Sequence, residues 1–171
     1  MSSLTSATFA AMNYVNIRKS ISENPISTVP KLVWKIVESN LSEYQISYHR
    51  LGTRCRPIYQ LMPKSGGPPL LLKAYGGDGS FFRVTKEFTA RRVDYVVYIW
   101  DIFGEPTSYI LNVAEAFDVL GPFALKTRAW RKDGIYSWSS ATGVPRQRKI
   151  RFEEEFCERW DWLQKDIERV R

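Results

Sequence analysis

The chain has 171 residues, of which 44% are hydrophobic and 25% are charged, and 25 Lys and Arg residues outnumber 18 Asp and Glu residues. This length and composition predict one globular domain with its own core, and they exclude a chain that is disordered throughout. The net charge of +7 favours nucleic acid or an anionic membrane surface over an acidic protein as the partner.

Cysteine usage and hydropathy indicate the compartment. Cys55 and Cys157 lie far apart and neither belongs to a Cys-x-x-Cys pair, so the sequence indicates neither a disulfide framework nor a zinc ribbon. The densest apolar run, residues 93–99, is too short for a membrane helix, and residues 1–11 lack the pattern of a secretory signal. We therefore expect a cytoplasmic protein without a membrane partner, associated with the nucleoid if it binds DNA.

The first predicted elements are an arm and a helix. Residues 1–26 are expected to form a flexible N-terminal arm, and residues 27–171 a single domain. Ser27 or Thr28 can cap a helix whose apolar residues recur at helical spacing from Val29 to Leu41. This helix is the clearest element in the N-terminal half.

Five strands are then predicted from apolar runs that are separated by turn residues, at residues 44–51, 57–62, 70–75, 95–100 and 108–111. Every residue of the fourth run is aliphatic or aromatic, so both faces of that strand are apolar. This indicates a central strand covered on both sides. A short helix is expected at residues 114–120 and a longer amphipathic helix at 152–170. The predicted fold class is α/β, with a central mixed β-sheet of about five strands flanked by helices.

The segment between the last two predicted helices is strongly basic. Residues 126–151 contain eight cationic side chains and one acidic residue, Asp133, and aromatic residues are interleaved with the cations. Cations neutralise phosphates and aromatic rings can stack on bases, so the segment predicts a nucleic-acid-binding surface. Its candidate residues are Lys126, Arg128, Trp130, Arg131, Lys132, Trp138, Arg146, Arg148, Lys149 and Arg151. The alternative is that the cations of the segment neutralise the charge of the acidic helix that follows, and that the aromatic residues of the segment lie in the core.

A second basic set extends this prediction. Arg50, Arg54 and Arg56 stand at the end of one predicted strand and before the next, where they are expected to hold phosphates on the same face. The single histidine, His49, has nothing in the sequence that ties it to a serine or cysteine nucleophile. Metal-dependent hydrolysis by carboxylates and a lysine is therefore the enzymatic possibility that remains.

The order of elements resembles the PD-(D/E)XK nuclease superfamily. The chain has a helix, three strands with a lysine near the end of the third, the segment Val-Asp-Tyr-Val-Val-Tyr at 93–98, Ser-Tyr-Ile-Leu-Asn-Val at 108–113, and Trp-Asp-Trp-Leu at 160–163. It is similar to the small homing-endonuclease-like and Holliday-junction-resolvase-like members of that superfamily, over residues 31–163. The resemblance implies a restriction-endonuclease-like fold.

The resemblance also implies a catalytic site. In that family a Glu on the first helix, an Asp on the second strand and Glu/Gln-x-Lys on the third hold Mg²⁺ and orient the attacking water. By this match Lys73 is the lysine, Glu38 is the helix acid and metal ligand, and Gln60 is a neutral ligand on the second strand. Leu71 stands where the motif has its first acid, and the segment 57–62 contains no Asp.

Three functions follow from these observations. The leading hypothesis is a nucleic-acid-binding protein, with DNA favoured, that has a nuclease-like fold and is catalytically degenerate or dependent on a partner. The second is an active Mg²⁺-dependent DNA endonuclease whose rearranged site includes Glu38 and Lys73. The third is a structural or assembly protein that acts through protein contacts, and a homodimer or a larger complex is left open.

Overall fold

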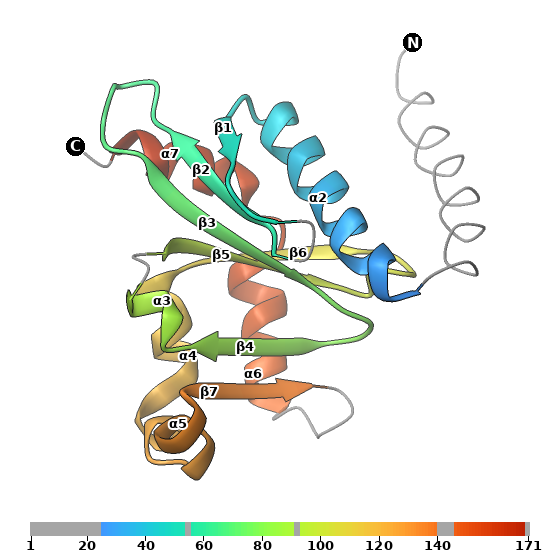
Figure 1. Cartoon of the computed structure of the whole chain (residues 1–171), viewed down its shortest axis with the longest axis vertical. Coiled ribbons are helices and arrows are strands. Elements are labelled where there is room, and N and C mark those ends of the chain that lie inside the picture. The colour runs from blue at the N-terminus through green and yellow to red at the C-terminus, as the bar shows by residue number, and fades with distance from the viewer. Residues whose placement is uncertain (1–24, 54–55, 91–92, 140–145, 170–171) are drawn as a thin grey trace.

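A computed structural model describes residues 25–53, 56–90, 93–139 and 146–169 (Figure 1). Within these residues, five strands form one mixed sheet in the order β1-β2-β3-β5-β6, and β4 and β7 pair as a separate ribbon. Helices flank the sheet, which confirms the predicted α/β class and the mixed sheet of about five strands. Most of the expected arm, residues 1–26, lies outside the described residues. No helix in the described ranges is long and apolar enough to cross a membrane.

The strands of the large sheet match the predicted runs closely. Strand β2 is antiparallel to its neighbours β1 and β3, β3 and β5 are parallel, and β6 is antiparallel to β5. As expected, β5 is buried along both faces. Their bounds are Ser47–Arg50 for β1, Ile58–Met62 for β2, Leu70–Gly76 for β3, Val93–Trp100 for β5 and Thr107–Asn112 for β6.

Helix α2 (Pro25–Glu43) covers one face of this sheet. It begins two residues before the predicted cap at Ser27, and it ends where Gln45 takes a positive φ of 55° and the Ile46 amide donates to the Leu41 carbonyl at 2.8 Å. The buried residues of α2 pack in a hydrophobic cluster with alternate residues of the strands. This first cluster includes Leu32, Val33, Val37, Leu41, Tyr59, Leu72, Val97 and Ile110.

The opposite face of the sheet carries a second hydrophobic cluster, which is rich in aromatic side chains. The β4–β7 ribbon and the helical segments after it supply most of this cover, including Phe82, Trp138, Phe152 and Phe156. Elements on this side are β4 (Phe81–Thr85), α3 (Glu87–Ala90), α4 (Val113–Leu125), α5 (Arg128–Asp133), β7 (Ile135–Ser139), α6 (Arg146–Arg151) and the π-helical turn η1 (Phe152–Phe156). The sheet is therefore buried on both faces, and the ribbon was not predicted.

The long C-terminal helix expected at residues 152–170 is wrong, because the chain breaks in the middle of it. Phe152 and Phe156 pack in the second cluster, whereas Trp160 and Leu163 of α7 (Trp160–Arg169) pack in the first. One straight helix cannot reach both faces of the sheet. The chain passes the edge strand β6 at Glu158, whose amide donates to the Ser108 carbonyl at 2.8 Å while its carboxylate accepts from the Ser108 amide at 2.5 Å.

A β-bulge fixes the start of β3 against β5. Leu71 pairs with Val93 and Leu72 pairs with Tyr95, so Asp94 is the extra residue between them. The Asp94 carboxylate accepts a hydrogen bond from the Leu71 amide at 2.7 Å. Partial burial raises the pKa of Asp94 above its ordinary value, and the Leu71 amide lowers it by a smaller amount.

We predict that the bulge makes stability depend on pH through Asp94. A raised pKa means that the Asp94 carboxyl holds its proton more tightly in the folded state than in the unfolded chain. The resulting contribution to the free energy of unfolding is therefore fully present below about pH 4 and is lost as the pH rises through the folded pKa. The free energy of unfolding of the wild type, minus that of Asp94→Asn, should fall as the pH is raised in urea titrations. A difference that rises with pH would contradict this assignment.

Candidate anion-binding site

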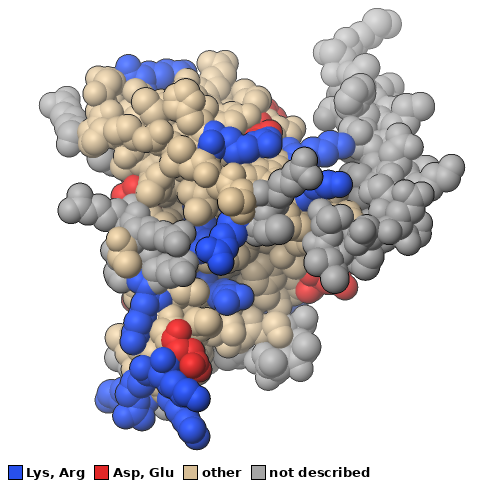
Figure 2. All heavy atoms as spheres, viewed as in Figure 1, with Lys and Arg blue, Asp and Glu red and all other residues tan. Residues whose placement is uncertain are grey.

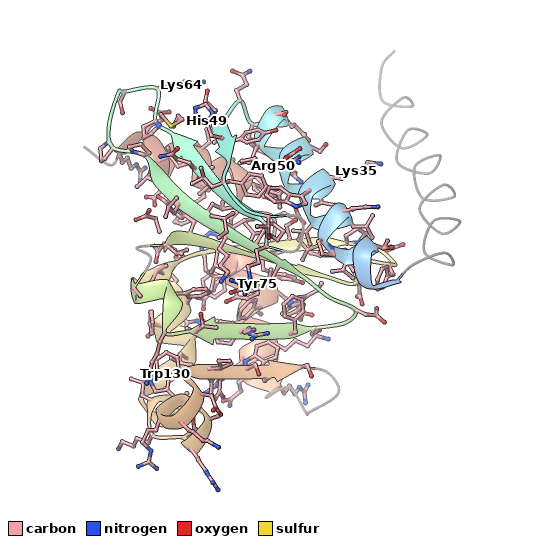
Figure 3. The ribbon with its side chains drawn as sticks, viewed as in Figure 1. Lys35, His49, Arg50, Lys64, Tyr75 and Trp130 are labelled. Atoms are coloured by element: carbon pink, nitrogen blue, oxygen red, sulfur yellow. The ribbon has the colours of Figure 1, made fainter. Side chains whose placement is uncertain are left out.

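A basic pocket of about 430 Å³ is lined by residues of β3 and of the β4–β7 ribbon. Among the described residues, its wall carries five cationic side chains and one carboxylate, from Arg56, Lys73, Arg83, Lys86, Lys132 and Asp133. In Figure 3, Tyr75, another lining residue, lies between β3 and β4. In Figure 2, Lys and Arg side chains gather over α5, and further ones lie toward the middle of the same face.

Lys73 reaches the pocket because strands alternate. Its neighbours on β3, Leu72 and Ala74, point into the first cluster beside α2, so Lys73 points to the opposite face. Its side chain is 9% exposed, and its Nζ lies 5.1 Å from the ring centre of Tyr75 and 5.6 Å from that of Phe88. The fold thus holds an ammonium group at depth beside aromatic faces.

The ribbon supplies the opposite wall by the same alternation. On β4, Phe82 and Val84 point into the second cluster, which turns Arg83 and Thr85 toward the pocket. Arg83 is exposed, whereas Thr85 is 8% exposed. Within the described part of the chain, the Thr85 Oγ1 atom has no hydrogen-bond partner.

Helix α5 brings Lys132 and Asp133 to the rim, and both of its ends are capped. The Thr127 hydroxyl accepts from the Trp130 amide at 3.3 Å, and Gly134 ends the helix with a φ of 64°. The Gly134 carbonyl accepts from the Lys86 amide at 2.8 Å, which ties α5 to the end of β4. A Cβ atom at Gly134 would lie 2.8 Å from the Lys86 side chain, so only glycine fits there without displacing Lys86.

The structure does not bring the predicted catalytic residues together. Glu38 lies on α2 and forms an ion pair with Arg50, whose guanidinium also stacks 4.4 Å from the ring centre of Trp34. These groups lie on the α2 side of the sheet, whereas Lys73 lies on the other side. Gln60 pairs with Leu71 on the Lys73 side. Glu38 and Gln60 therefore lie on opposite sides of the sheet.

These positions do not fit the Mg²⁺ site that the nuclease resemblance implies. Glu38 is engaged by a cation, and Leu71 offers no oxygen ligand on the strand that carries Lys73. Among the described residues, no group of three or more His, Cys, Asp or Glu side chains is placed to hold a metal ion. We derive no catalytic step through a metal from this arrangement.

The predicted basic segment is divided between two faces of the ribbon. The cations of α5 lie near the pocket, and within the described residues Lys126, Arg128, Arg131 and Lys132 form no ion pair. Helix α6 lies behind the ribbon in Figure 1, where Arg148 donates to the Tyr136 hydroxyl at 2.7 Å. The Tyr136 ring packs against the second cluster, so α6 is on the core side of β7.

Acidic side chains already engage two of the α6 cations. Arg151 forms ion pairs with Asp118 at 2.7 Å and with Glu155 at 2.9 Å, and Lys149 pairs with Glu153 at 3.7 Å. Helix α6 also carries the exposed Arg146. For this helix we favour the second interpretation of the basic segment, in which its cations neutralise the charge of the acidic residues that follow it. The residues that remain candidates for phosphate binding are therefore those of the pocket and of α5.

The two tryptophans of the segment have different positions. Trp138 is 4% exposed, and its ring packs on Phe82 at 5.7 Å and Phe152 at 5.7 Å, so the prediction that it stacks on bases is wrong. Trp130 is half-buried against Phe117, and the Lys86 Nζ lies 6.0 Å from its ring centre. Trp130 thus remains beside the cationic surface (Figure 3).

The second basic set is also divided. Arg56 is exposed and lines the pocket, whereas Arg50 is bound to Glu38 on the other side of the sheet, and Arg54 lies outside the described residues. Sequence reasoning missed Arg83, Thr85 and Lys86 because no strand was predicted between residues 75 and 95. The alternation of Phe82 and Val84 with polar residues was the signal that could have found them.

Replacing the two tryptophans should separate core from surface. We expect Trp138→Ala to lower the free energy of unfolding by about 3–5 kcal/mol, since the change empties a buried aromatic site. Trp130→Ala should cost less because its ring is half-buried. Urea denaturation followed by circular dichroism measures both, and equal losses for the two variants would contradict the assignment.

Comparisons with known proteins found no relative from which a function could be inferred. The sequence matches no model of a known protein family, and neither the curated proteins nor the solved structures gave a match. The observations that bear on function are therefore those of the chain itself: a buried lysine, an unpartnered buried hydroxyl and a ring of further cations around one pocket.

Proposed function

We propose that the chain binds nucleic acid, with DNA favoured, and that the basic pocket and the α5 cations hold its phosphates. The observation that carries this proposal is the convergence of Lys73, Arg83 and Lys132 with two further cations on one pocket, where the described residues supply a single carboxylate. The five cations come from four separate segments of the chain, so sequence proximity does not account for the meeting of those segments.

The electrostatic cost of this arrangement supports an anionic ligand. Like charges that face one pocket repel each other, and desolvating an ammonium group such as that of Lys73 adds to the cost. A phosphate chain removes the repulsion and releases counterions when it binds. Within the described residues Arg83 and Lys132 form no ion pair, whereas Arg50 and Arg151 are paired with carboxylates.

The resemblance to PD-(D/E)XK nucleases agrees with this location, and we propose a restriction-endonuclease-like fold that binds without cutting. The matched lysine, Lys73, lies in the pocket. The one carboxylate that the described residues contribute to the lining, Asp133, comes from α5 and not from the strands that carry the acids of that family. Binding to DNA would place the protein at the nucleoid in the cytoplasm, as its composition led us to expect.

The proposal predicts binding that weakens steeply with salt. If about five phosphates are contacted, the logarithm of the association constant for duplex DNA should fall with the logarithm of salt concentration at a slope of about −4 to −5. Affinity should then drop roughly 10²- to 10³-fold between 50 and 200 mM salt. Fluorescence anisotropy with labelled duplex, single-stranded and RNA oligonucleotides measures this slope, and a flat salt response would contradict phosphate contact.

Matched charge variants locate the surface. We expect Arg83→Gln with Lys132→Gln to weaken binding and to reduce the magnitude of the salt slope by about 2, because two phosphate contacts are lost. The control pair, Arg146→Gln with Lys149→Gln, removes the same charge from α6 and should leave the slope unchanged. Equal effects of the two pairs would mean that net charge, and not the pocket, determines binding.

A further inference from the structure

We propose that the floor of the pocket is a subsite for a terminal phosphate monoester, the phosphorylated end of a nucleic-acid strand. This inference rests on the proposed function and deepens it. Two side chains form the floor from opposite walls, Lys73 on β3 and Thr85 on β4, and each is more than nine-tenths buried. The other lining cations, Arg56, Arg83, Lys86 and Lys132, are exposed around them.

Thr85 is the residue that points to a ligand. A buried hydroxyl without a hydrogen-bond partner is disfavoured, since it has left water and gained nothing in return. Thr85 pairs with Ile135 of β7 across the ribbon. Both residues line the pocket, as does Arg83 on the same face of β4. The Oγ1 atom is covered in the structure, so the Thr85 side chain must turn about χ1 to present it to the pocket. An anionic oxygen that enters the pocket can then accept a hydrogen bond from Thr85 while it meets the Lys73 ammonium.

The number and charge of the donors favour a monoester over a phosphodiester. An internal phosphodiester carries one negative charge and has both ester oxygens tied into the chain, so it suits an open surface that the strand crosses. A phosphate monoester carries a charge of about −1.5 to −2 near neutral pH and three acceptor oxygens. Lys73, Thr85 and the exposed cations above them match that larger charge and higher acceptor count.

The size of the pocket agrees with such a ligand. Its volume of about 430 Å³ lies in the range of roughly 300–1,000 Å³ that is usual for small-molecule sites. One terminal phosphate with its attached sugar can enter, and the rest of the strand would leave across the exposed cations of α5. Tyr75, which lines the pocket and stacks on Tyr98 at 5.8 Å, provides an aromatic wall.

Oligonucleotides that differ only at their ends test the inference. Three labelled DNA strands of one sequence, with a 5′-phosphate, a 3′-phosphate or hydroxyls at both ends, are compared by fluorescence anisotropy at one salt concentration. We expect at least one phosphorylated strand to bind about tenfold or more tightly than the strand without a terminal phosphate, because charged hydrogen bonds are gained. A preference for only one phosphorylated strand identifies the end that is recognised.

Thr85→Val provides the sharpest variant. Valine keeps the shape of the side chain and removes the unpartnered hydroxyl, so the free energy of unfolding should stay the same or rise, while the preference for the phosphorylated strand falls. Lys73→Met should remove the preference as well. Lys64→Gln is the control, since Lys64 lies at the far end of the molecule from the pocket (Figure 3), and the preference should survive this change.

The outcomes separate the inference from the proposed function. Equal binding of all three strands, with the steep salt dependence intact, overturns the terminal-phosphate subsite and leaves nucleic-acid binding in place. Failure of every strand to bind overturns the proposed function itself. A preference that Thr85→Val leaves intact also overturns the subsite, because the buried hydroxyl would then have no part in it.

Discussion

The site depends on the alternation of side chains along β3, a strand buried from both sides. Leu70, Leu72 and Ala74 must face α2 to complete the first hydrophobic cluster, and this requirement sends Lys73 to the opposite face. The bulge at Asp94 fixes the pairing of β3 with β5, and a slip of one residue would exchange the two faces. The position of the buried ammonium is thus set by the packing of the apolar residues beside it.

The same sheet sorts the charges of the molecule into two kinds of environment. On the α2 side, Glu38 binds Arg50. Behind the ribbon, Lys149 binds an acid of the turn that follows α6, and Arg151 binds an acid on α4. At the pocket, five cations and one carboxylate come from the described residues. A net charge of +7 therefore matters less for function than the place where cations outnumber acids.

The parts of the fold with strong local patterns could be predicted from the sequence. The apolar runs gave β2, β3, β5 and β6, and helical spacing gave α2. The break at Glu158 could not be predicted, because Phe152 to Ile167 keep a helical spacing and only the two separate clusters reveal that the chain must change face. The pocket was hidden for a related reason: it forms where β4 and β7, far apart in sequence, pair with each other. The interleaved Trp138 suggested a binding surface, but the alternation of β7 buries it.

The central claim is that anionic strands bind on the Lys73 side of the sheet, at the ribbon and α5. Titration of the ¹⁵N-labelled chain with a 5′-phosphorylated oligonucleotide, followed through the backbone amide chemical shifts, tests it most directly. The account predicts the largest changes at residues 73–75, 83–86 and 132–135, with small changes along α2 and α6. Large changes on α6, or around Glu38 and Arg50, with the pocket residues unmoved, would contradict it.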